Sequence, residues 1–306
     1  MSGWRRGLRR WLRTALPSLF IIGTMSACSQ LPGAAEPAKP PRFDDGLAKL
    51  FPDGPQPEAH DYLVEGRSIH YLVMPGGPQR VLFIHGTPGN WQGWHRYLAD
   101  PRLRERATLI AVDRPGFSNS GSGQMAPALA DQSRLLAPLL GNDGHKTWLV
   151  GHSLGGPIAA KMAMDYPEQV AGVLMLAPSI SPALERPRWF NHLADTWLAR
   201  SLKGTWLQRL FADDDLFNSN DEIMPLVGEL AAIEPDWARL TMPLVVVQGM
   251  KDTLVSPRTA EYAEQTLPRP NTRVIRLPED NHFLIWNDYP YCSALIVELL
   301  DQTSRP

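Results

Sequence analysis

From Tyr62 onward, short apolar runs alternate with segments in which apolar residues recur every three or four positions. Uninterrupted runs are typical of strands buried on both faces, and the wider spacing is typical of amphipathic helices. A chain that alternates the two is expected to form a mostly parallel sheet with helices on both faces. The predicted buried strands are Val81–Ile84, Leu109–Val112, Trp148–Val150, Val173–Leu176, Leu244–Val247 and Val274–Leu277.

Two earlier segments, Tyr62–Glu65 and Ile69–Val73, suit an antiparallel pair that opens the sheet, which brings the expected number of strands to eight. The chain has 306 residues, of which 43% are hydrophobic, so it can build one full core, and disorder is excluded. We therefore expect a single α/β domain over residues 59–306. Its predicted helices are Trp91–Leu98, Ala128–Leu140, Leu154–Tyr166, Pro257–Thr266 and Pro290–Leu300.

The charge of the chain argues against a nucleic acid partner. Residues 28–306 hold 25 basic and 32 acidic residues, so their net charge is −7. Nucleic-acid-binding domains usually carry a basic surface, and this composition does not provide one. The sequence also contains no phosphate loop of the form G-x-x-x-x-G-K-S/T and no H-E-x-x-H motif, so it predicts no cofactor and no metal.

Residues 1–27 have the pattern of an export signal, because five arginines precede Ala15–Met25, an apolar run too short for a comfortable membrane span. The residues Met-Ser-Ala-Cys at 25–28 resemble the lipobox of bacterial lipoproteins. The resemblance implies cleavage before Cys28, acylation of Cys28 and a lipid anchor in the bacterial cell envelope, with the outer membrane facing the periplasm as the expected destination. A plain signal peptide is the alternative, and Arg9-Arg10 leaves twin-arginine export open.

Residues 28–58 are rich in proline and poor in large apolar residues, so we predict a tether through which no helix or central strand runs. Such a tether would hold the folded domain away from the membrane. An acylated Cys28 cannot form a disulfide with Cys292, the second cysteine of the sequence. Cys292 is then predicted to be a small buried residue of the C-terminal helix and not a nucleophile.

The residues Gly-His-Ser-Leu-Gly at 151–155 directly follow one predicted strand and open a predicted helix. They fit the pattern G-x-S-x-G, in which a tight turn strains the backbone of the serine and exposes its oxygen at a helix N-terminus. With this motif the chain resembles the α/β-hydrolase family over about residues 62–300. The resemblance implies an α/β-hydrolase fold and a nucleophile, here Ser153, that is followed along the chain by an acid and then a histidine.

Two further segments stand where the family places its acid and its histidine. The strand that ends at Val247 is followed by Gln-Gly-Met-Lys-Asp, similar to the family's acid turn, which makes Asp252 the candidate acid. The strand that ends at Leu277 is followed by Pro-Glu-Asp-Asn-His, similar to the family's histidine loop, which makes His282 the candidate base. His282 would take the proton of Ser153, and Asp252 would orient the imidazole.

Other titratable residues compete for these roles. No buried strand precedes the competing carboxylates, so we interpret them as solvated charges, and we interpret His152 as a packing residue of the turn. The competing carboxylates are Glu279, Asp280 and Asp213–Asp215.

The residues His-Gly-Thr-Pro-Gly at 85–89 follow the strand Val81–Ile84 and resemble the family's H-G-x-P-G loop. By that match, the backbone amides of Thr87 and Leu154 form the oxyanion hole. Pro88 has no N–H to contribute, and His85 is predicted to brace the loop. The later turn Asp113–Ser120 resembles the family's D-x-P-G-x-G-x-S turn, and we interpret it as structural.

About sixty residues, roughly 180–241, separate two strands that one helix should join, so we predict a helical cap insertion above the serine. Its aromatic rings either line a pocket or form the core of the cap itself, and the sequence leaves both interpretations open. The rings belong to Trp189, Phe190, Trp197, Trp206, Phe211 and Phe217.

These features predict a serine hydrolase that cleaves carboxylic esters through an acyl-enzyme and acts on a small-molecule apolar acyl substrate. The same triad also suits an amide, a lactone or a carbon–carbon bond beside a ketone. An alternative of a different class is a lipoprotein that keeps the fold but only binds or scaffolds. Ser153 at the nucleophile position excludes the relatives that attack with an aspartate.

Overall fold

The chain divides into two units, Met1–Pro40 and Pro41–Pro306. The computed structural model describes residues 47–52, 54–121, 124–187, 196 and 214–303, with the backbone alone at 214–217. The predicted signal peptide and Cys28 lie outside these residues. The strands are β1 Glu58–Val64, β2 Arg67–Ile84, β3 Ala107–Val112, β4 Thr147–His152, β5 Val170–Leu176, β6 Leu244–Gly249 and β7 Thr272–Leu277.

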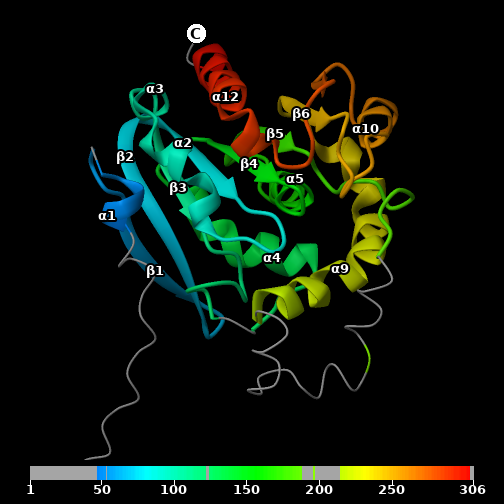
Figure 1. Cartoon of the computed structure of the whole chain (residues 1–306), viewed down its shortest axis with the longest axis horizontal. Helices are drawn as coiled ribbons and strands as arrows, with labels where there is room; N and C mark the ends of the chain where they lie inside the picture. Colours follow the sequence, from blue (N-terminus) through cyan, green and yellow to red (C-terminus); the bar gives the residue numbers. More distant parts are fainter. Residues whose placement is uncertain (1–46, 53, 122–123, 188–195, 197–213, 304–306) are drawn as a thin grey trace, which may run out of the picture. The chain divides into compact units, whose positions relative to one another are not determined.

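Helices connect these strands and cover the sheet (Figure 1). The longest described helix is α9, which lies between β5 and β6, where the cap insertion is predicted. The α-helices are α1 Leu47–Leu50, α2 His95–Ala99, α3 Pro101–Arg104, α4 Leu129–Leu136, α5 Gly155–Asp165, α9 Asp214–Ile233, α10 Thr259–Thr266, α11 Leu284–Asn287 and α12 Tyr289–Thr303, and the 3-10 helices are η2 Trp91–Trp94, η3 Ala137–Leu140 and η4 Glu234–Arg239.

All eight predicted strand segments are present, but the second and third are two arms of the single strand β2. The C-terminal arm pairs in parallel with β3 from Arg80 to Ile84. In the other arm, residues 71–74 pair with β3 in the reverse order, so that Tyr71 lies opposite Val112 and Met74 lies opposite Leu109. Strand β3 therefore lies between the two arms. The bend contains Gly76, where a Cβ atom would approach the carbonyl oxygen of Ala107 to 2.2 Å.

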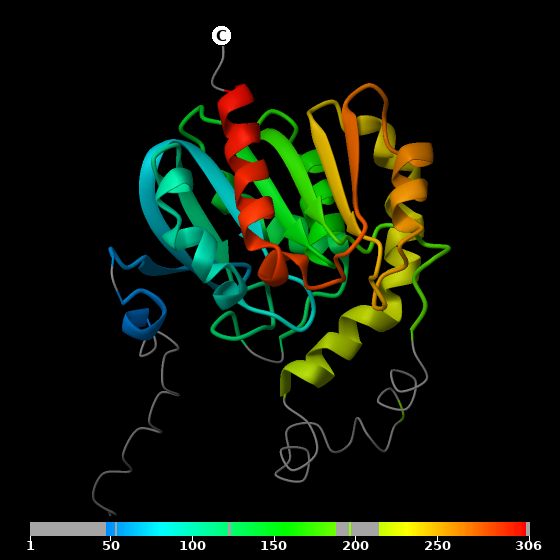
Figure 2. The ribbon, with the colours of Figure 1, turned by 45° about the horizontal axis from the view of Figure 1, so that its top comes forward.

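The remaining strands extend the sheet in the order β2-β4-β5-β6-β7, and each neighbouring pair is parallel. Because side chains alternate along a strand, each strand feeds two cores. Leu149 of β4 points into a core formed with α4, α5, α9, α10 and η4, whereas Val150 points into a core formed with η2, α2, α3, α11 and α12. Figure 2 shows α12 in front of the strands and α5 behind them. The predicted fold, with helices on both faces, is confirmed.

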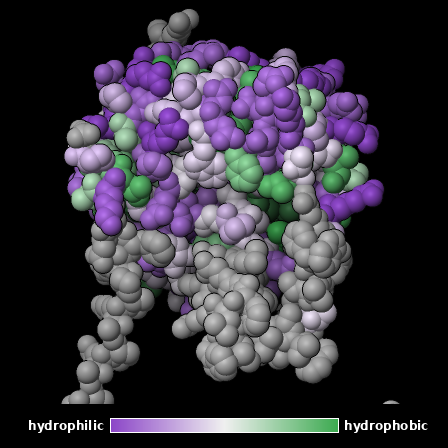
Figure 3. Space-filling model, viewed as in Figure 1, coloured by the Kyte–Doolittle hydropathy of each residue, from purple (hydrophilic) through white to green (hydrophobic). Residues whose placement is uncertain are grey.

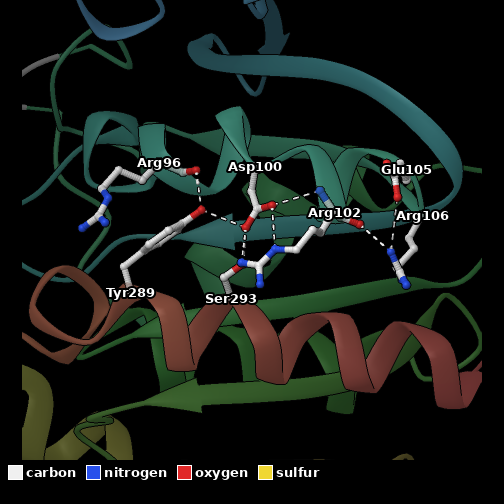
Figure 4. Close-up of polar contacts among 7 residues, drawn as sticks. All are labelled: Arg96, Asp100, Arg102, Glu105, Arg106, Tyr289 and Ser293. Atoms are coloured by element: carbon white, nitrogen blue, oxygen red, sulfur yellow. Dashed lines mark hydrogen bonds and ion pairs between the residues drawn. The ribbon is translucent and has the colours of Figure 1, made fainter.

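The C-terminal helix α12 is attached to α3 through a buried carboxylate (Figure 4). Asp100 accepts hydrogen bonds from the backbone N–H and the guanidinium group of Arg102, from the hydroxyl of Tyr289 at 2.8 Å, and from the hydroxyl of Ser293. Burial favours the neutral acid, but the donated hydrogen bonds outweigh it and hold the pKa of Asp100 well below its usual range. Cys292 is fully buried in the same helix, as predicted.

The prediction that no helix runs through residues 28–58 is wrong at α1. Phe51, which follows α1, is only 4% exposed and belongs to the same core as α12. An aromatic side chain of this size gains enough from burial to order the residues beside it, despite the nearby prolines. Among the described residues, no helix is long and apolar enough to cross a membrane.

The described part of the predicted cap comprises α9, η4 and the short segments beside them. Leu226, Leu230 and Ile233 of α9 pack into the core on the α5 side of the sheet. The cap aromatics lie outside the described residues, since Trp189, Phe190, Trp197, Trp206 and Phe211 are not described and Phe217 has a described backbone only.

Candidate active site

Ser153 lies in the turn between β4 and α5, and its backbone has a φ of 54°, in the left-handed region that non-glycine residues rarely adopt. Two neighbouring glycines are sterically required. A Cβ atom at Gly151 would lie 2.2 Å from the carbonyl oxygen of Gly155, and a Cβ atom at Gly155 would lie 2.2 Å from that of Ile84. The backbone N–H of Ser153 donates to Leu176 of β5 at 3.0 Å, which fixes the strained turn to the sheet.

The structure brings Asp252 and His282 together at the ends of β6 and β7. The Nδ1 atom of His282 lies 2.8 Å from Oδ2 of Asp252. A carboxylate only accepts hydrogen bonds, so Nδ1 is the donor and Nε2 is left as the acceptor. The other oxygen of Asp252 accepts the backbone N–H groups of Leu254 and Val255, at 2.8 and 2.9 Å, which hold the carboxylate in place.

One competing carboxylate, Glu279, and the imidazole of His152 have other contacts. Asp213 lies outside the described residues, and Asp214 and Asp215 have a described backbone only. Glu279 is exposed and forms an ion pair with Lys251. The Nε2 atom of His152 lies 2.9 Å from the carbonyl oxygen of His282, and its ring packs edge-on against Trp286. Burial, assisted by the nearby His282, lowers the pKa of His152 to about 3, so this imidazole is neutral and donates to the histidine loop.

The loop that contains Thr87 is supported by His85 and Arg114. His85 uses both ring nitrogens, because Nδ1 lies 2.7 Å from the carbonyl oxygen of Gly86 and Nε2 accepts the backbone N–H of Arg114 at 2.9 Å. The guanidinium group of Arg114 donates to the carbonyl oxygens of His85 and Gly86 at 2.8 and 2.9 Å. These contacts fix the two peptide groups that precede Thr87.

Arg114 also joins this loop to α9, which lies in the predicted cap. It is fully buried and donates to both carboxylate oxygens of Glu222 on α9, at 2.6 and 2.9 Å. Gln132 of α4 donates to Glu222 at 2.7 Å, and the amide of Asn218 donates to the carbonyl oxygen of Gly116 at 3.2 Å. The turn 113–120, interpreted from the sequence as structural, therefore connects α9 to the Thr87 loop.

Two cavities, of about 160 and 360 Å³, meet beside Ser153, and both are also lined by Thr87, Leu254 and His282. The second cavity opens between the Thr87 loop and the aromatic side chains of Phe283 and Trp286. Several large apolar side chains are exposed around it, and Figure 3 shows apolar surface beside a hollow near the middle of one face. Residues that line only the first cavity are Leu154, Ser179, Glu185, Arg186, Pro187, Ile223, Leu226, Val227 and Val255.

Glu185 of this cavity was not predicted from the sequence. The pKa of Glu185 is raised to about 7, mainly by burial; a hydrogen bond with the hydroxyl of Ser179 opposes this change, and the nearby Asp252 adds to it. Among the described residues, its Oε1 atom is buried and has no hydrogen-bond partner. No cluster of His, Cys, Asp and Glu side chains in this part of the chain is arranged to hold a metal ion.

A model of the Alpha/beta hydrolase family matches residues 81–290, more than half of the chain. The chain belongs to the α/β-hydrolase family. Family membership confirms the predicted fold, and it supports the prediction of a hydrolase enzyme. All the residues discussed above, from the Thr87 loop to His282, lie within the matched region.

Individual relatives agree with this assignment. The chain is 35% identical over 240 residues to a pimeloyl-[acyl-carrier protein] methyl ester esterase from Aeromonas hydrophila, covering 67% of this chain and 89% of the relative. It is 36% identical over 110 residues to Lipase LipV from Mycobacterium tuberculosis, covering 35% of this chain and 40% of the relative. The chain spans 30–65% of the length of three of the curated relatives it matches.

Solved structures show the same fold. An α/β hydrolase from a Medee basin deep-sea metagenome library superposes with a TM-score of 0.65 at 16% identity, covering 81% of this chain and 99% of that one.

Proposed function

We propose that the chain is a serine hydrolase that cleaves carboxylic esters, with Ser153 as nucleophile, His282 as base and Asp252 as the orienting acid. The observation that carries the proposal is the contact between Nδ1 of His282 and Asp252, which leaves Nε2 as a proton acceptor beside the cavities that Ser153 lines. The strained turn at Ser153 supports the same role. Relatives named as a lipase and as a methyl ester esterase favour an ester over the alternative bonds.

The chemistry follows from these positions. The oxygen of Ser153 attacks the ester carbonyl carbon and passes its proton to Nε2 of His282, while the backbone amides of Thr87 and Leu154 stabilise the oxyanion. His282 then protonates the departing alcohol, which leaves an acyl-enzyme. Water attacks the acyl group and gives one proton to His282, which returns it to Ser153 as the acid is released. The two cavities provide room for the acyl and alcohol parts on either side of the serine.

We also propose that acylated Cys28 anchors the enzyme in a bacterial envelope, with the outer membrane facing the periplasm as its site. The lipobox-like residues 25–28 and the arginine-rich segment before them support this proposal.

Fluorophosphonate labelling and ester hydrolysis test the catalytic proposal. We expect Ser153→Ala to abolish labelling and to lower kcat/KM by at least about 10³-fold, His282→Ala to cost nearly as much, and Asp252→Ala to cost less. The matched control is Ser68→Ala in β2, which should label and turn over like the wild type. Labelling of Ser153→Ala at the wild-type level would exclude the mechanism. Labelling without hydrolysis of any ester would point to the amide, lactone or carbon–carbon alternatives, and no labelling of the wild type would favour the binding protein.

A further inference from the structure

Glu185 is a titratable side chain inside the cavity that also contains Ser153 and His282. It lies between β5 and α9, within the predicted cap insertion, and its backbone N–H donates to the carbonyl oxygen of Ser181 at 3.1 Å. Its Oε1 atom is buried, with no hydrogen-bond partner among the described residues. A buried polar atom without a partner carries a desolvation cost that natural proteins rarely keep without a reason.

The surroundings of Glu185 do not supply that reason in the free enzyme. The hydroxyl of Ser179 interacts with the carboxyl group, and the carboxylate of Asp252 is close enough to repel it. Asp252 itself is engaged with His282 and with two backbone N–H groups. The one cationic side chain among the described residues that line this cavity is Arg186, which is exposed.

The cavity combines polar groups beside Ser153 with an apolar wall formed by residues of α9 and of the loop after Asp252. A substrate arm that enters it is held mainly by hydrophobic contacts with this wall and meets the carboxyl group of Glu185 at one place. The apolar wall consists of Ile223, Leu226, Val227, Leu254 and Val255. Such a cavity suits an arm with an apolar body and a single polar substituent.

We propose that Glu185 is a specificity-determining residue that binds a hydroxyl group on the substrate arm occupying this cavity. The proposal rests on the proposed ester hydrolase function and names the class of ester: one whose acyl or alcohol arm carries a hydroxyl near the scissile bond.

A hydroxyl fits better than the other polar groups. Burial places the pKa of Glu185 at about 7, so both the carboxylate and the acid are populated at neutral pH. A hydroxyl donates to the carboxylate and accepts from the acid, so it pairs with either form. A carboxylate on the substrate would be repelled by Glu185 and Asp252. A cation would pair only with the ionised form of Glu185, and Arg186 lines the same cavity.

Matched ester pairs test this inference. The acyl-arm pair is p-nitrophenyl 3-hydroxybutyrate and p-nitrophenyl butyrate, and the alcohol-arm pair is 2,3-dihydroxypropyl butyrate and propyl butyrate. For each pair we define the hydroxyl preference as the ratio of kcat/KM for the hydroxylated ester to that for the plain ester. We expect a preference of at least about 10 in one pair, because a site built to bond a hydroxyl rejects the analogue that lacks it.

Variants then assign the preference to Glu185. Glu185→Leu should lower the ratio at least about tenfold, and Glu185→Gln, whose amide still bonds a hydroxyl, should lower it less. The control Glu168→Leu makes the same change at an exposed position that precedes β5, and it should keep the wild-type ratio. Fluorophosphonate labelling of each variant verifies that Ser153 remains reactive.

The outcomes separate this inference from the proposed function. If the wild type hydrolyses plain esters but shows no hydroxyl preference in either pair, or if Glu185→Leu keeps the preference, the assignment of Glu185 is overturned and the serine hydrolase mechanism stands. If the wild type prefers butyrylcholine to 3,3-dimethylbutyl butyrate, the cavity selects a cation and the hydroxyl assignment is wrong. If no ester is hydrolysed and no serine is labelled, the proposed function itself fails.

Discussion

Replacing Glu222 with glutamine tests whether the buried ion pair with Arg114 holds α9 on the rest of the domain. The substitution keeps the shape of the side chain and removes its charge. In the wild type, two hydrogen bonds of 2.6 and 2.9 Å join side chains that are 0% and 1% exposed. Removing one partner of a buried pair leaves an uncompensated charge and costs about 3–5 kcal/mol. We expect Glu222→Gln to lower the free energy of unfolding by that amount.

The chain contains a matched control on its surface. Arg276 and Glu264 form the same kind of bidentate ion pair, with hydrogen bonds of 2.6 and 2.8 Å, but their side chains are 37% and 41% exposed. Water and salt screen such a pair, which contributes about 0–1 kcal/mol. Glu264→Gln should therefore cost less than about 1 kcal/mol, although the broken contact has nearly the same geometry.

Urea denaturation followed by far-UV circular dichroism at pH 7 measures both variants. Because α9 also carries Ile223, Leu226 and Val227 of the Ser153 cavity, Glu222→Gln should raise KM for esters as well. Equal losses of stability for Glu222→Gln and Glu264→Gln would refute the argument, since burial would then not determine the strength of the pair. A large loss of stability with unchanged KM would show that α9 does not shape the cavity during turnover.

Two further predictions concern the attachment of the C-terminal helix α12 and the predicted N-terminal lipid anchor. Asp100→Asn should lower the free energy of unfolding by about 1–3 kcal/mol at neutral pH, because it removes the charge that Arg102, Ser293 and Tyr289 bind. The pKa of Asp100 is lowered in the folded state, so this stability is present above about pH 4 and is lost as the pH falls further. In urea titrations, the difference in free energy of unfolding between variant and wild type should be smaller at pH 3 than at pH 7. An equal difference at both pH values would contradict the assignment. Cys28→Ser should abolish fatty-acid labelling and move the protein from the membrane fraction to the soluble fraction, and a variant that still requires detergent for release would disprove the lipid anchor.

The strands and the motif residues were predictable because their signals are local. A strand buried on both faces must be apolar throughout, so β4, β5 and β6 stand out in the sequence. The turn at Ser153 is equally local, since Gly151 and Gly155 occupy places where a Cβ atom has no room. Parallel strands end at the same edge of a sheet, and that rule alone brings the turns after β4, β6 and β7 close together.

Other features depend on distant partners and could not be read from the sequence. The two arms of β2 were predicted as separate strands, because the Pro-Gly-Gly-Pro residues at 75–78 are typical of a loop. They form one bent strand because both arms pair with β3. Arg114 and Glu222 are 108 residues apart, and each by itself has the character of a surface residue. Only the packing of α9 shows that they are buried together.

The sheet and the segment between β5 and β6 therefore contribute different properties to this protein. The proposed nucleophile, base and acid all follow strands, whose positions are fixed by hydrogen bonds to neighbouring strands. The apolar wall of the first cavity and Glu185 come mostly from the segment between β5 and β6 and from the loop after Asp252. Substitutions at Ser153 should thus decide whether an ester is cleaved at all, and substitutions at Glu185 should decide which ester is preferred. Because Arg114 connects the Thr87 loop to Glu222 of α9, the two properties are separable only while that buried pair is intact.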